Sequence, residues 1–193
     1  MAADSAVARV VFREIVPGDL RKVEADAQDA GTGGGARDLR FRPYEKFAPV
    51  FSVLLPERVP EMRKRGGERV PVELSRGKLY WLEEEETRSA EAVFEPPTDA
   101  RPGEGRLTCV HNVPPLRELP ERDGRFVLLL VQDGAGRVWP HVVTDTSLRG
   151  GEWDDAVAQP IVKCLDAAAG RKSVCAGYID LTNDTRYCNA SVL

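Results

Sequence analysis

The chain has 193 residues, of which 42% are hydrophobic and 30% are charged, and its formal net charge is −4. A chain of this length can bury one full core, and its acidic balance excludes a uniformly basic nucleic-acid coat. No apolar run approaches the roughly 18 residues of a membrane span, and the N-terminus lacks the features of a secretory signal. We therefore expect a cytoplasmic protein.

The charges are distributed unevenly along the chain. Residues 1–80 contain 15 Lys and Arg against 12 Asp and Glu, whereas residues 81–193 contain 12 against 19. The first part therefore carries a net +3 and the second a net −7. This asymmetry allows a basic face in the first half and an acidic surface in the second.

Short segments with strand-like alternation or apolar content recur along most of the chain. In order, they are residues 6–15, 39–42, 69–74, 77–82, 87–94, 106–112, 126–131 and 137–143. Residues 47–55 (FAPVFSVLL) fit either a core strand or a short buried helix, and residues 56–68 are expected to form a polar bend. Many short strands with Gly- and Pro-rich turns favour a β-barrel or a sandwich.

The C-terminal part has a different pattern. Residues 154–169 place apolar side chains at helical spacing, with Asp154 or Asp155 as N-cap and Gly170 as the stop. The remaining tail can add a strand. Glu83–Glu86 is expected to be a solvated turn, because four consecutive carboxylates cannot converge on a metal from a strand or a helix.

Catalytic and metal-binding signatures are weak. Cys109 and His111 would share one face of a strand, but no other residue supports this pair as a catalytic dyad. The four cysteines, at 109, 164, 175 and 188, contain no Cys-x-x-Cys pair, so we expect free thiols and no metal site. The sequence predicts no enzyme and no cofactor.

Residues 29–43 (DAGTGGGARDLRFRP) combine a glycine turn with an arginine-bearing strand. They lack the Lys-Ser/Thr of a phosphate-binding P-loop. Glycine lets a backbone approach phosphate, and Arg40 and Arg42 would point to one side while Leu39 and Phe41 anchor the strand. The segment is either a nucleic-acid-binding arm or a flexible loop followed by ordinary solvated arginines.

Three segments, taken in order, resemble the effector-binding N-terminal domain of EcoRII-type restriction endonucleases, a DNA-binding pseudobarrel shared with plant auxin-response transcription factors. They are TGGGARDLRFRP (residues 32–43), GEGRLTCVHNVPPL (103–116) and ERDGRFVLLLVQDGAGRVWPHVV (121–143). The resemblance covers residues 7–145. The family commonly has His-Gln after its Gly-Gly; Gly35-Ala36 stands there in this chain, and Arg37 is the substitute polar reader.

The resemblance implies a mostly β fold, a seven- to eight-stranded open pseudobarrel with one or two short helices in residues 1–150. The helical spacing of residues 154–169 predicts in addition that residues 151–193 form a C-terminal helical appendage, a helix and tail packed on this domain.

The resemblance also implies a non-catalytic protein of bacterial restriction or phage defence, which recognises a short or modified site in double-stranded DNA through two arms. These arms are centred on residues 21–42 and 104–112, and a separate nuclease or effector subunit is a further implied partner. The implied DNA-binding residues are Arg21, Lys22, Thr32, Gly33, Gly34, Arg37, Arg40, Arg42, Glu104, Arg106 and Thr108. The alternative function is a protein–protein interaction or accessory module with an acidic binding surface that includes Glu83–Glu86.

Overall fold

The computed structural model describes residues 6–16, 19, 38–108, 110–116, 124–171 and 173–190. Six predicted DNA-binding residues lie outside these ranges: Arg21, Lys22, Thr32, Gly33, Gly34 and Arg37. Cys109 also lies outside them, so the Cys109/His111 pair stays a prediction. No helix of the described residues is long and apolar enough to cross a membrane.

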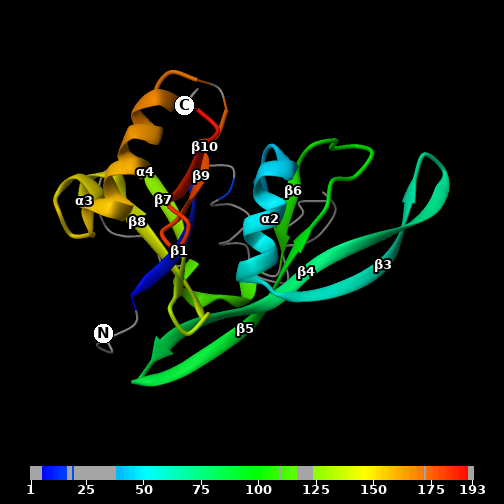
Figure 1. Ribbon diagram of the computed structural model, residues 1–193, viewed down its shortest axis with the longest axis horizontal. Coiled ribbons are helices and arrows are strands. Elements are labelled where there is room, and N and C mark those ends of the chain that lie inside the picture. Colours follow the sequence, from blue (N-terminus) through cyan, green and yellow to red (C-terminus); the bar gives the residue numbers. More distant parts are fainter. Residues whose placement is uncertain are drawn as a thin grey trace.

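The described residues contain one ten-stranded sheet, which curls into an open half-barrel (Figure 1). The strand order is β10-β9-β1-β7-β8-β4-β5-β6-β2, and β3 pairs with β4 beside this path. Neighbouring strands are antiparallel except β4 and β8, which are parallel. The strands are β1 Val7–Ile15, β2 Leu39–Phe41, β3 Glu57–Arg65, β4 Glu68–Glu83, β5 Glu86–Glu95, β6 Gly105–Thr108, β7 Phe126–Asp133, β8 Val138–Thr144, β9 Ala176–Asp180 and β10 Thr185–Cys188.

Three α-helices and two 3₁₀ turns accompany the sheet in the described ranges. The helices are α2 Tyr44–Leu54, α3 Asp145–Arg149 and α4 Asp155–Ala168, and the turns are η2 Val110–Asn112 and η3 Pro114–Leu116. Residues 47–55 are therefore largely helical, and α2 buries Phe47, Val50, Phe51 and Leu54 at helical spacing. The prediction of α4 is confirmed, because the Asp154 side chain accepts a hydrogen bond from the amide of Ala156.

Two hydrophobic cores lie on opposite faces of the sheet. In β7, Leu128 and Leu130 pack into the core inside the curl, whereas Val127, Leu129 and Val131 pack into a second core under α4. A strand that is covered on both faces has no polar alternation, which is why FVLLLV is continuously apolar. The predicted mostly β, open pseudobarrel is thus confirmed as a fold class, and the tail contributes β9 and β10 to the same sheet.

Two sequence predictions are wrong. Residues 57–65, predicted as part of a polar bend, are β3, which pairs with β4 from Glu57↔Arg76 to Arg65↔Glu68. This hairpin projects as a two-stranded ribbon (Figure 1), so most of its side chains need not be apolar. The cysteines are not all free thiols, because Cys164 and Cys188 form a disulfide. With β3 and the two C-terminal strands, the described strands number ten rather than seven or eight.

A substitution at Gly105 tests how tightly the core inside the curl is packed. A Cβ at Gly105 would lie 2.2 Å from Cζ of Phe94, which is itself buried against Phe51. We expect Gly105→Ala to lower the free energy of unfolding by about 1–3 kcal/mol, measured by urea denaturation. Gly134→Ala is the matched control, since its nearest neighbour would be 3.6 Å away; equal losses in both variants would contradict this packing.

Candidate nucleic-acid interface

The five predicted DNA-binding residues that the structure describes lie together. Arg40 of β2 and Arg106 of β6 are directly opposite each other in an antiparallel pair. Arg42 follows β2, Glu104 precedes β6, and Thr108 ends β6. The described parts of the two predicted arms are therefore neighbouring strands at one edge of the sheet.

Carboxylates occupy the spaces between these arginines. Glu104 lies 3.3 Å from Nη1 of Arg40 and 2.7 Å from Nη2 of Arg42. Asp38, which is 1% exposed, lies 3.3 Å from Nε of Arg40 and 3.8 Å from Nη1 of Arg106. These contacts hold the arginines in place and neutralise much of their charge.

A second carboxylate group extends this cluster toward the ribbon. Glu95 accepts hydrogen bonds from Arg106 and, at 3.2 Å, from Oγ1 of Thr108. Arg63 of β3 lies 2.9 Å from Glu95 and 2.9 Å from Glu61. Burial opposes the charge of Arg63, but the hydrogen bonds to Glu61 and Glu95 outweigh it and raise the pKa of the guanidinium. The cluster thus pairs four arginines with four carboxylates and carries no net charge.

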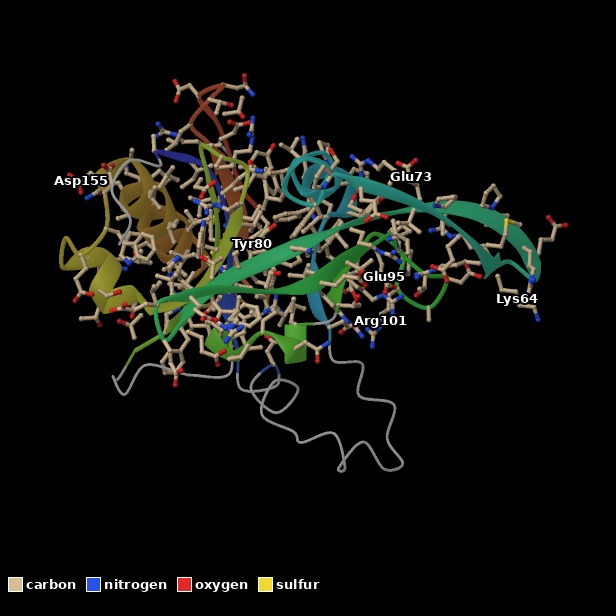
Figure 2. All side chains as sticks on the ribbon, turned by 90° about the horizontal axis from the view of Figure 1, so that it is seen from below. Lys64, Glu73, Tyr80, Glu95, Arg101 and Asp155 are labelled. Carbon is tan, nitrogen blue, oxygen red and sulfur yellow. A yellow bond between two sulfur atoms is a disulfide. The ribbon has the colours of Figure 1, made fainter. Side chains whose placement is uncertain are left out.

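The uncompensated cations lie instead at the end of the β3–β4 ribbon, here called the basic tip, residues 63–69. It contains four cations and one carboxylate. Because Arg63 is already paired with Glu61 and Glu95, the remaining residues of the tip carry a net charge of +2. Lys64 and Arg69 are exposed, stand directly opposite each other on the same face, and form no ion pair with the described residues. Like charges directly opposite each other destabilise a strand pair. An anion bound between Lys64 and Arg69 would relieve this repulsion. Figure 2 shows Lys64 at the far end of the ribbon, beyond Glu95 and Arg101.

The loop between β5 and β6 connects the basic tip with the charge cluster. Arg65 donates a hydrogen bond of 2.6 Å to the carbonyl of Pro97, and the amide of Gly66 donates one of 2.7 Å to Asp99. The same loop carries Arg101, which is exposed and has no ion pair to a described residue, and it ends at Glu104. Exposed cations therefore continue from the tip along this loop to Arg42, which is 63% exposed.

Sequence reasoning missed the basic tip. The signal was available in the repeated tetrapeptide Glu-Arg-Val-Pro at residues 57–60 and 68–71, which flanks RKRGG on both strands. A Gly-Gly pair between two similar segments with β-branched residues is typical of a hairpin. Gly66 and Gly67 both adopt positive φ, at 58° and 91°, as that turn requires.

The end of β4 away from the basic tip is acidic. Glu83–Glu86 forms the turn between β4 and β5, with Glu84 and Glu85 at positive φ, and Arg88 pairs with Glu83 and Glu86. The prediction of a solvated turn is confirmed. Leu82 beside it is 59% exposed.

A cavity of about 520 Å³ opens next to the charge cluster. Arg40, Arg42 and Glu104 line it together with Arg13 and Asp19, which form a buried ion pair of 2.8 Å. Among the residues that the structure describes, the charged groups in the wall of this cavity are already paired with each other.

Histidine chemistry has no support from the described side chains. His141 packs edge-on against Trp153, with ring centroids 5.4 Å apart, and burial lowers the pKa of its imidazole. Its described surroundings include no nucleophile paired with it. Comparisons with protein-family models, with curated proteins and with solved structures give no match for this chain.

Proposed function

We propose that this protein binds double-stranded DNA without catalysing a reaction, and that the basic tip of the β3–β4 ribbon makes the main contact. The observation that carries the proposal is the exposed pair Lys64 and Arg69, which face the same way at the end of a projecting ribbon without a carboxylate partner in the described residues. Such a pair is matched by two phosphate groups or by the acceptor-rich edge of a guanine.

The dimensions of the ribbon support this ligand. The major groove of B-DNA accepts a two-stranded β-ribbon. The ribbon has nine residue pairs between Glu57↔Arg76 and Arg65↔Glu68, so its tip can enter a groove while the half-barrel stays outside. Arg101 lies on the loop that the ribbon contacts through Arg65 and Gly66, and Arg42 pairs with Glu104 at the end of that loop. Both can contact the flanking phosphates.

The resemblance to the EcoRII-type effector-binding domain favours the same class of ligand, a short or modified duplex site. In that reading Arg40 and Arg106 lie in the arms, but each is tied to carboxylates in this chain. We therefore assign the charge cluster a supporting contact and the basic tip the leading one.

A random duplex library tests the proposal. The full chain is incubated with the library at roughly 50 mM salt, bound DNA is separated by mobility shift and sequenced, and the affinity is measured again at roughly 200 mM salt. We expect binding that weakens steeply with salt, because counterions are released from the phosphates. No retention of any duplex at the lower salt concentration would reject the proposal.

Neutralising Glu104 is expected to strengthen binding. Glu104→Gln keeps the side-chain shape but releases the charges of Arg40 and Arg42. We expect an affinity for duplex DNA about 3- to 10-fold higher at low salt and a salt slope steeper by about one. Glu83→Gln, at the acidic turn, removes the same charge far from the proposed interface and is the control. An affinity and a salt slope unchanged from the wild type, as expected for the control, would exclude Arg40 and Arg42 from the interface.

A second candidate function is the binding of a protein through the acidic turn. It is favoured by one observation, the exposure of Leu82 beside Glu83–Glu86 at the end of β4 away from the basic tip. Capture of the same protein from cells of the source with and without nuclease treatment would support it, provided that Leu82→Ser abolishes the capture.

A further inference from the structure

Three cysteines far apart in the sequence meet beneath α4. Cys164 of α4 is bonded to Cys188, the last residue of β10. The thiol of Cys175 lies 3.2 Å from Sγ of Cys164, and the three sulfur atoms lie within 4.8 Å of one another. All three residues are buried, with exposed fractions of 1%, 0% and 8% for Cys164, Cys175 and Cys188.

We propose that Cys164, Cys175 and Cys188 form a thiol–disulfide exchange site with two interchangeable pairings. Cys175 loses its proton to water or hydroxide, and its thiolate attacks Sγ of Cys164. The Cys164–Cys188 bond breaks, a Cys164–Cys175 bond forms, and Cys188 leaves as a thiolate that takes a proton from water. One disulfide and one thiol are present before and after, so the step needs no oxidant or reductant.

The contact between Cys175 and Cys164 carries this inference. Thiol–disulfide exchange proceeds by attack of a thiolate on a disulfide sulfur. The separation of 3.2 Å matches the distance between reacting atoms in a near-attack arrangement. Because the three sulfur atoms all lie within 4.8 Å of one another, they are not in line, and the Cys175 side chain must rotate before it attacks along the disulfide axis.

Exchange would change what holds the edge of the sheet. In the present pairing, the disulfide ties α4 to β10, and β10 has β9 as its strand partner in the described chain. In the alternative pairing, α4 would be tied to Cys175, which directly precedes β9. Residues 185–190 would then be held by the β9 ladder and by side-chain contacts alone. Exchange would thereby remove or restore the covalent link between α4 and the edge strand β10.

The surroundings of Cys175 slow this exchange in the folded protein. Burial, with a smaller contribution from Glu14 of β1, raises the pKa of the Cys175 thiol to about 12, and Arg125 acts in the opposite direction. Arg125 pairs with Glu14 at 2.8 Å, and the amide of Cys175 donates to the other Glu14 oxygen. From α4 and β10, the groups that face the thiol are the disulfide sulfurs themselves. At pH values below this pKa, the thiolate fraction increases tenfold for each unit by which the pH rises. The rate of exchange should therefore increase by about the same factor per pH unit.

Trapping with iodoacetamide tests the proposal on the folded wild-type chain. The protein is held at a series of pH values between neutral and moderately alkaline, and samples are mapped by mass spectrometry without reduction. We expect the label to appear on Cys188, always together with a Cys164–Cys175 disulfide, at a rate that rises about tenfold per pH unit. Label on Cys175 with the original disulfide intact, or no label on these three cysteines, would overturn the proposal.

Two variants separate exchange from simple opening of the fold. Cys175→Ser cannot exchange, so Cys188 must stay unlabelled at every pH; labelling as fast as in the wild type would reject the mechanism. Cys188→Ser leaves Cys164 and Cys175 as neighbouring thiols, and oxidised glutathione should join them into a disulfide. Two free thiols in folded Cys188→Ser after this treatment would also reject it. If this variant does not fold, the wild-type trapping experiment decides alone.

Discussion

Reversing the charges of Lys64 and Arg69 together is expected to lower the affinity for duplex DNA about 100-fold at low salt, and the salt slope by about two. The two side chains lie opposite each other at the end of the ribbon and have no carboxylate partner in the described chain. Glutamates at both positions would replace two attractive contacts with phosphate by two repulsive ones. Fluorescence anisotropy with a labelled duplex, at several salt concentrations, measures both quantities.

The matched control makes the same change of charge elsewhere. Lys163 on α4 and Arg171 beyond its end are exposed and form no ion pair with a described residue, and Figure 1 places α4 on the opposite side of the molecule from the ribbon. Lys163→Glu with Arg171→Glu should change the affinity by about twofold or less, because distant charges are screened by salt. Equal losses in the two double variants would mean that only net charge matters, and the ribbon would not be the contact.

The strands that could be predicted from the sequence are those that bury at least one face against a core. Val10 and Val11 of β1 face different cores, and the hairpin between β7 and β8 has its Asp-Gly turn, so apolar content and turn residues sufficed for both. β3 was missed for a physical reason. Met62 is 54% exposed, and most of the ribbon touches solvent on one face or both. Its strand is maintained by backbone pairing with β4, which leaves no hydrophobic period to detect.

The sequence indicated several members of the charge cluster, including Glu104 and Thr108, but not the ion pairs between them. The sequence indicated Arg40, Arg42 and Arg106 as neighbours through the resemblance, and β2 and β6 do pair. Glu95, which comes from β5, was not indicated, and neither was the pairing of Glu104 with Arg40 and Arg42. Counting arginines along the chain therefore overstated how basic this surface is. The disulfide was missed for a similar reason. Cys164 and Cys188 are 24 residues apart and meet only because α4 packs across the strands.

The largest loss of stability is expected at Phe51, on the inner face of α2. Its ring stacks on Phe94 at a centroid distance of 3.9 Å and meets Phe41 edge-on at 4.9 Å. We expect Phe51→Ala to lower the free energy of unfolding by about 3–5 kcal/mol, since the substitution removes buried surface and leaves a cavity between rigid strands. For a chain of this size the midpoint of thermal unfolding should fall by roughly 6–20 °C, which calorimetry measures.

Phe51→Ala also separates stability from binding. Phe41 and Phe94 directly neighbour Arg40 and Glu95, so the ring cluster lies beneath the charge cluster, whereas the basic tip has no contact with Phe51. At temperatures where the variant is folded, the affinity for DNA should therefore stay within about threefold of the wild type if the tip is the main contact. Val53→Ala, on the exposed side of the same helix, should change stability by about 0.5 kcal/mol or less. If Phe51→Ala folds but no longer binds DNA, the main contact must be made by the arginines of the charge cluster and not by the basic tip.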